Sequence, residues 1–108
     1  MSITISSPKY VNVILPLAVP KNYTYKVPSS MCGDIEFGKR VEVPLRNRAY
    51  SAIIVETMNE ANVTYKAKDI RAVIDKEPII TEKQYDLWKW MAKYYCCTVG
   101  EVMMVALP

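Results

Sequence analysis

The first two-thirds of the chain alternates short apolar runs with polar breaks, a pattern typical of β-strands. In Tyr23, Tyr25 and Val27, apolar side chains recur at every second position and so share one face. The pattern predicts strands at Tyr10–Leu15, Tyr23–Val27, Arg40–Val43, Tyr50–Glu56 and Ile70–Ile74. Pro44 is expected to end the third strand, and Thr57–Lys68 to form a polar loop. Short strands with turn signals between them favour a small barrel or sandwich over about residues 10–75.

After Pro78 the apolar spacing becomes helical. Thr81 and Gln84 fit a T-x-x-Q capping box, and Ile80 and Tyr85 are placed as its hydrophobic staple. The apolar positions of this helix, predicted over about residues 82–95, are Leu87, Trp88, Met91 and Tyr95. The sequence therefore predicts a mainly β domain with C-terminal helices.

A second capping box, Thr98 to Glu101, opens a short helix over about residues 99–105. This helix is apolar nearly all round, so burial is expected on every side. Either the barrel covers it, or the chain is cut from a longer protein. The expected organisation is one domain, with a helical extension at about residues 79–108.

Composition excludes several classes of enzyme. The 108 residues include no histidine, which removes Ser-His and Cys-His catalysis and histidine-ligated zinc. Three glycines cannot form a phosphate-binding glycine-rich loop. Cys32, Cys96 and Cys97 lack metal-site spacing and are expected to be reduced thiols. We expect no catalytic residue, metal or cofactor, and a cytoplasmic protein without a signal peptide or membrane span.

The net charge of +3 is unevenly distributed. Through Ser51 the chain has seven Lys or Arg against three acids, which gives +4, whereas the remainder has seven against eight, which gives −1. Candidate cations for an anionic partner are Lys21, Lys26, Arg46, Arg48, Lys66 and Lys68. They accompany Tyr23 and Tyr25, a combination typical of barrels that bind single strands. The alternative is that both tyrosines are core and the cations only solubilise the domain.

Several segments resemble the start of the PriA family of bacterial replication-restart helicases. The similar segments are Pro16–Pro28, Gly38–Leu45, Ile53–Glu56, Ala72–Thr81 and Leu87–Pro108. They follow the family's order and cover nearly the whole chain from Tyr10. The resemblance implies a small OB-like β-barrel with attached helices, which recognises the 3′ end of a DNA strand at stalled forks or D-loops. The family's helicase motor, with its ATP, Mg²⁺ and zinc, lies further along such proteins.

The resemblance also implies a pocket for the terminal nucleotide, formed by Tyr23, Thr24, Leu45, Arg46 and Lys68. Arg48 matches a basic position of the same turn, and we expect Arg48 and Lys66 to contact phosphate. Two positions depart from the family, which commonly has Asp in place of Thr24 and Gly in place of Arg46. The first departure replaces a carboxylate with a single hydroxyl. The second places a long cation where close backbone approach is expected.

The partners that this reading implies are DNA with a 3′-hydroxyl end, the helicase core of the same parent protein and other primosome proteins. An alternative function is protein interaction through an apolar helical surface formed by Trp88, Trp90, Met103 and Met104. Of these side chains, Trp88 is expected to be core, whereas Trp90 falls off the apolar stripe. An independent enzyme is disfavoured by the missing histidine and glycine-rich loop.

Overall fold

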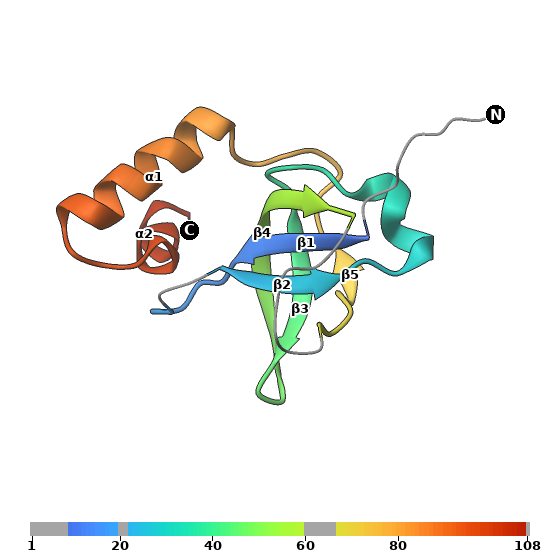
Figure 1. The fold of residues 1–108 in the computed structure, drawn as a ribbon. Helices are drawn as coiled ribbons and strands as arrows, with labels where there is room; N and C mark the ends of the chain where they lie inside the picture. Colours follow the sequence, from blue (N-terminus) through green and yellow to red (C-terminus); the bar gives the residue numbers. More distant parts are fainter. Residues whose placement is uncertain (1–8, 20–21, 60–66, 108) are drawn as a thin grey trace.

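The computed structural model describes residues 9–19, 22–59 and 67–107, which form an antiparallel sheet and two α-helices (Figure 1). The strands are β1 (Tyr10–Ile14), β2 (Tyr23–Lys26), β3 (Arg40–Leu45), β4 (Arg48–Met58) and β5 (Ala72–Val73). Their order in the sheet is β2-β1-β4-β3-β5. The helices are a short 3-10 turn, η1 (Ser29–Asp34), and α1 (Glu82–Tyr94) and α2 (Val99–Ala106). The predicted mainly β fold with C-terminal helices is confirmed.

Residues 68–73 close the sheet into a small barrel by joining its two edges. At one edge the Lys26 amide donates to the Lys68 carbonyl at 2.8 Å, and the Ile70 amide donates to the Lys26 carbonyl at 3.0 Å. At the other edge β5 pairs with Val41 and Glu42 of β3. The resulting closure is consistent with the expected OB-like barrel.

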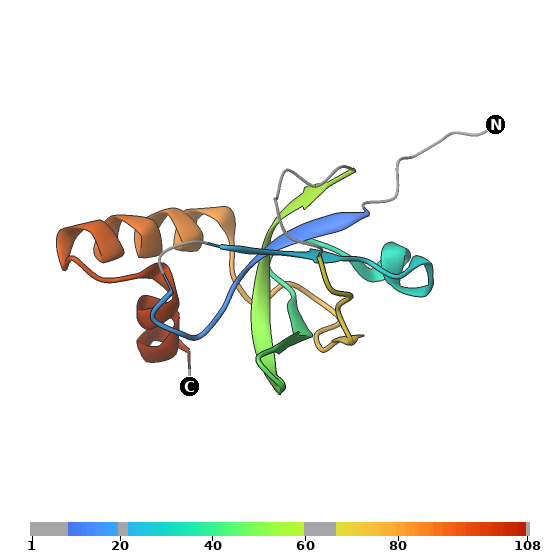
Figure 2. The ribbon, with the colours of Figure 1, turned by 60° about the horizontal axis from the view of Figure 1, so that its bottom comes forward.

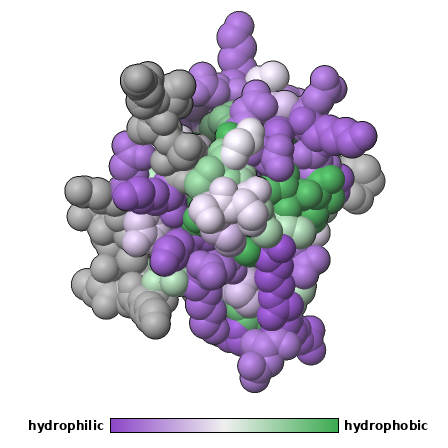
Figure 3. All heavy atoms as spheres, turned by 90° about the vertical axis from the view of Figure 1, so that its right-hand side faces the viewer, coloured by the Kyte–Doolittle hydropathy of each residue, from purple (hydrophilic) through white to green (hydrophobic). Residues whose placement is uncertain are grey.

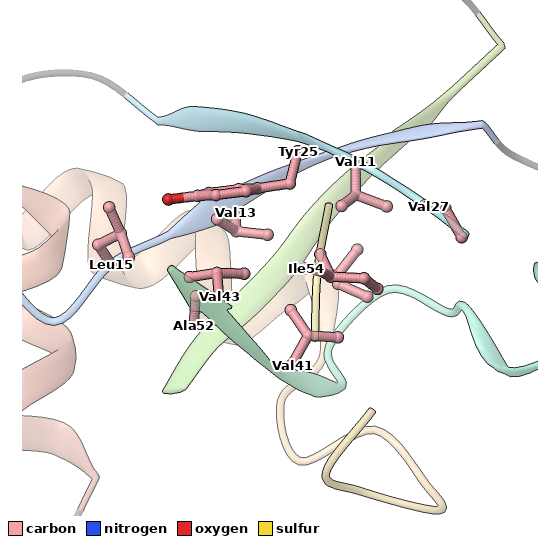
Figure 4. Close-up of a cluster of buried hydrophobic side chains, with 10 residues drawn as sticks. Val11, Val13, Leu15, Tyr25, Val27, Val41, Val43, Ala52 and Ile54 are labelled. Atoms are coloured by element: carbon pink, nitrogen blue, oxygen red, sulfur yellow. The ribbon is translucent and has the colours of Figure 1, made fainter. Parts of the chain in front are cut away.

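The barrel interior is filled by side chains that alternate along the strands (Figure 4). Val11 and Val13 of β1 lie opposite Tyr25 and Tyr23 of β2, and these residues face inward together. The buried members of this inner cluster are Val11, Val13, Leu15, Tyr25, Val27, Val41, Val43, Ala52, Ile54 and Ile70. Period-two alternation therefore predicts the core face correctly.

Both helices lie at one end of the barrel (Figures 1 and 2). Ile14 and Ile53, which point away from the inner cluster, pack there against Trp88 of α1 and Val102 and Met103 of α2. Both predicted capping boxes are present, with Thr81 and Thr98 as N-caps. Within the described residues, neither helix is long and apolar enough to cross a membrane.

Gly100 of α2 lies very close to the chain that leaves β1. A Cβ atom at this position would lie 2.2 Å from the Leu17 carbonyl oxygen and 2.3 Å from that of Leu15. Any side chain would therefore collide with backbone, which has no rotamer with which to move aside. Glycine allows α2 to lie directly against the chain that leaves β1.

Four expectations about the elements were wrong. Strand β3 continues through Pro44 to Leu45, because beyond Glu42 it pairs only with β4 and needs no donor on its other side. Strand β4 begins at Arg48 and ends at Met58, and β5 is only two residues long. The barrel covers only part of α2: Val102 and Met103 are buried, whereas Val105 is 89% exposed.

Candidate nucleic-acid interface

Tyr23 and Tyr25 share the inner face of β2 but have different environments. Tyr25 is 3% exposed, and its hydroxyl donates to the Pro44 carbonyl at 2.9 Å. Tyr23 is half-buried and packs at the edge of the inner cluster. The interpretation as core therefore holds for Tyr25, whereas Tyr23 keeps part of its ring accessible at the rim.

The predicted arginine turn is a two-residue hairpin between β3 and β4. Leu45 pairs with Arg48, and the central residues Arg46 and Asn47 have φ angles of 51° and 65°. Positive φ at both central positions is the geometry of a type I′ turn, which favours Asn and Gly. Leu45 packs on the inner cluster, and both arginines are exposed. The hairpin, which projects from the barrel (Figure 1), therefore carries two exposed cations.

Lys68 lies on the segment beside β2. It is exposed, and its carbonyl accepts the bond from the Lys26 amide. Lys66, like Lys21, lies outside the described residues. Among the ion pairs of the described residues, none includes Arg46, Arg48 or Lys68. No carboxylate of the described residues therefore neutralises these three charges.

Hydrogen bonds connect β2 to the two other predicted site segments. The Tyr25–Pro44 bond joins β2 to the base of the hairpin, and the Lys26–Lys68 bond joins it to the closing segment. Tyr23, Leu45 and Lys68 thus lie on three segments that these bonds link through β2, although β2 and β3 are not neighbours in the sheet. The face opposite the helices, at the η1 side, is mainly hydrophilic with smaller apolar patches (Figure 3).

Thr24 faces the opposite side of β2 from Tyr23 and Tyr25. It is 5% exposed, and its hydroxyl donates to Oδ1 of Asn12 on β1. Nδ2 of Asn12 in turn donates to Oε1 of Glu56 on β4 at 2.7 Å. Sequence reasoning missed Asn12 and Glu56, although a polar residue in the centre of the apolar run Tyr10–Leu15 is a signal.

Arg40 and Asp75 form the most extensive ion pair of the described residues. The Arg40 amide and Nε both donate to Oδ2 of Asp75, at 2.9 and 3.0 Å, and Nη2 donates to Oδ1 at 3.0 Å. These hydrogen bonds hold the pKa of Asp75 below its ordinary value and raise the pKa of Arg40. The pair anchors the chain after β5 to β3, so its role is structural.

An exposed aromatic group lies on α1, away from the barrel. The rings of Trp90 and Tyr94 are stacked, with centroids 5.1 Å apart and an angle of 14°, and Tyr95 meets Tyr94 edge-on. Trp90 is 57% exposed, whereas Trp88 is buried, as expected. Of the proposed apolar docking surface, only Trp90 and Met104 are exposed, because Met103 packs against the barrel.

Comparison with known proteins identifies the family. A family model described as the 3′DNA-binding domain (3′BD) of PriA matches residues 12–108. The replication restart protein PriA of Buchnera aphidicola subsp. Schizaphis graminum is 30% identical over 99 residues, which are 91% of this chain and 14% of that relative. PriA of Haemophilus influenzae is 32% identical over 101 residues, which are 93% of this chain and 14% of that relative.

The chain therefore spans about one-seventh of the length of these relatives, and it matches their DNA-binding domain. The match covers all five strands except the start of β1, and both helices. The chain belongs to the family of PriA 3′-DNA-binding domains.

Proposed function

We propose that this domain recognises the 3′-hydroxyl end of a DNA strand at stalled forks or D-loops, in the cytoplasm. The observation that carries the proposal is the half-buried ring of Tyr23, whose strand is joined to the hairpin and to the Lys68 segment. An aromatic ring on a strand linked to segments that carry exposed cations can provide stacking for a base and attraction for phosphate. No metal or cofactor is needed for this chemistry.

The proposed pocket gives its residues different roles. Tyr23 stacks on the terminal base above Leu45, and Lys68 donates to the terminal sugar. Arg46, Arg48 and Lys66 hold phosphate, which supplies affinity without information about the terminus. Thr24 faces the opposite side of β2 from Tyr23 and donates its hydroxyl to Asn12, so its part in this pocket falls to its backbone.

The test is a titration against two oligonucleotides, one with a free 3′-hydroxyl and one with a 3′-phosphate. Lys68→Ala is expected to weaken binding of the free end by about 1–2 kcal/mol and to have little effect on the blocked end. Arg48→Ala is expected to weaken both alike, and Tyr23→Ala to cost roughly 1–3 kcal/mol on the free end. Lys83→Ala, on α1, controls for loss of a positive charge. Equal affinity of the unmodified domain for both oligonucleotides would remove end recognition.

A second candidate function is docking of a protein partner, and the stacked Trp90–Tyr94 pair favours it. A groove of about 460 Å³ lies between the helices, lined by Met91, Tyr95, Val102, Val105 and Ala106 among others. The partners we propose for this face are the helicase core and other primosome proteins. Trp90→Ala is expected to lower affinity for a helicase core supplied as a separate chain, without changing the DNA titration. Unchanged affinity for the core would exclude this docking role for Trp90.

A further inference from the structure

The face of α1 that points away from the barrel carries an apolar stripe. Leu87, Trp90 and Tyr94 follow one another at intervals of three and four residues, and each is more than half exposed. Side chains at this spacing share one face of a helix, whereas Trp88 and Ala92 of the same helix pack against the barrel and α2. In Figures 1 and 2, α2 and the barrel lie to one side of α1, and no described element covers its other side. The stripe is therefore open to a partner.

Charged residues extend and flank this stripe. Lys83 lies four residues before Leu87, so the stripe has spacings of four, three and four residues, the spacing of a coiled-coil seam. Asp86 and Lys93 each directly precede a stripe residue, so they lie along one flank of the stripe, toward opposite ends. Asp86 forms an exposed ion pair with Lys89, and Lys93 belongs to none of the ion pairs of the described residues. This flank therefore has a negative end and a positive end, both accessible.

The stripe is complementary to itself when two copies of α1 run antiparallel. If the two-fold axis crosses α1 midway between Leu87 and Trp90, Leu87 of each copy faces Trp90 of the other. The same symmetry places Lys83 of each copy beside the ring of Tyr94 of the other, where a cation is attracted to the π-system. A parallel pair would instead bring Lys83 against Lys83 of the second copy. The charge at the end of the stripe therefore favours the antiparallel arrangement.

The flanks of the stripe agree with this register. Asp86 of each copy lies beside Lys93 of the other, so opposite charges meet at both ends of one edge of the contact. Gln84 and Met91 occupy the other edge and are uncharged. Apolar contact at the centre and charge complementarity at the edge thus describe the same partner, a second copy of this chain.

We propose that α1 is a self-association face, which binds α1 of a second copy of this chain in the antiparallel sense. This inference deepens the second candidate function and rests on it, because it names a partner for the face that carries Trp90. A second copy and the helicase core then compete for this face. The test therefore uses the domain alone, without DNA and without the core.

Sedimentation equilibrium of the domain measures the association. We expect a dissociation constant on the order of 100 μM, because a single helix pair buries less than the roughly 800 Å² per partner of a standard interface. Asp86→Lys and Lys93→Asp are each expected to weaken the dimer about tenfold, since each brings like charges together at both ends of the contact. Glu77→Lys and Lys76→Asp make the same changes of charge at exposed positions outside α1 and are expected to leave the association unchanged.

A mixture of the two charge variants provides a rescue that damage to the fold cannot produce. One variant carries two positive charges on the flank and the other two negative charges, so we expect the equimolar mixture to associate about tenfold more tightly than either variant alone. A mixture without this gain, or control variants that weaken the dimer equally, would overturn the proposed contact.

The unmodified domain separates this inference from the function on which it rests. A domain that stays monomeric up to about 1 mM would overturn self-association. Binding of the helicase core by such a monomer, lost in Trp90→Ala, would leave the second candidate function intact. A dimer that the charge variants weaken and their mixture restores would support the inference, whether or not the core binds to the same face.

Discussion

Arg46 adopts a backbone conformation that is unfavourable for a residue with a Cβ atom. Its φ of 51° lies in the left-handed region, which costs an L-residue roughly 1–2 kcal/mol. The hairpin tolerates this cost because the twist of a type I′ turn matches that of the flanking strands. The family resemblance implies a glycine at this position, and the positive φ gives a conformational reason for it. The close approach of backbone to DNA that the resemblance implies would be a second reason.

Arg46→Gly is therefore expected to raise the free energy of unfolding by about 0.5–1 kcal/mol, because relief of the strain exceeds the entropy that glycine adds to the unfolded chain. Urea denaturation measures the change. Arg48→Gly is the matched control, since the same replacement within β4 should destabilise the domain. A less stable Arg46→Gly variant would contradict the account of the turn.

Asp75 gives the stability of the domain a dependence on pH. Because its pKa is lower in the folded than in the unfolded state, its contribution is fully present above the unfolded pKa, about 3.9. That contribution is lost as the pH falls through the lowered folded pKa. Asp75→Asn should cost about 1 kcal/mol at pH 7, a low value for a charged hydrogen bond because Arg40 is partly exposed.

The measurement is urea denaturation of both proteins from neutral pH to the acid range. The difference between them should shrink once the pH falls below the ordinary range of Asp. Asp86→Asn is the control, because Asp86 forms an exposed pair with Lys89 on α1, worth less than about 0.5 kcal/mol. A difference that stays constant with pH would show that the charge of Asp75 does not stabilise the fold.

At the scale of elements, the helices were predicted better than the strands. Each capping box spans only four consecutive residues, so a local pattern defines where each helix begins. The buried side of α1 was less predictable. Trp88 and Ala92 face the barrel, whereas Leu87 and Tyr95 of the expected stripe are 52% and 66% exposed. Tertiary packing selects this face, and both sides of the helix carry apolar residues.

Gly100→Ala tests the contact between α2 and the barrel. A methyl group there must push the helix away from the carbonyl oxygens of Leu15 and Leu17, so we expect a loss of about 1–3 kcal/mol despite the better helix propensity of alanine. Thermal unfolding measures the loss. Gly33→Ala is the control, since no atom lies within 4 Å of the added Cβ, and it should be neutral or slightly stabilising. A neutral Gly100→Ala variant would refute the close approach.

At the scale of the whole molecule, two features determine how residues around the candidate site are placed, and neither can be derived from local pattern. The closing segment forms its bonds to Lys26 over more than 40 residues of sequence, so its partner strand is set by topology. A bulge in β4 at Val55 changes the direction of Glu56 although the sequence there reads as an uninterrupted strand. By contrast, Tyr23 and Lys68 could be named as candidates from the type of residue, and their roles in the pocket, which the family resemblance implies, stay predictions.

The proposed end recognition predicts a modest dependence of DNA binding on salt. A terminal nucleotide and its neighbour provide about two or three phosphate contacts, so log K should fall with log salt with a slope of about −2, at roughly −0.7 per contact. Titration between about 50 and 200 mM salt measures the slope. A slope on the order of −6 would instead indicate a long non-specific track along the DNA backbone.

Closure of the barrel by residues 68–73 has a consequence for the newly synthesised chain. Strands β1 to β4 emerge from the ribosome before the segment that pairs with the outer edges of β2 and β3. During that interval the sheet has open edges on both sides, and such edges are templates for pairing with other chains. The domain is therefore most prone to aggregation while β1 to β4 are made and residues 68–73 are still missing, and the few residues that close the barrel also keep neighbouring nascent chains apart.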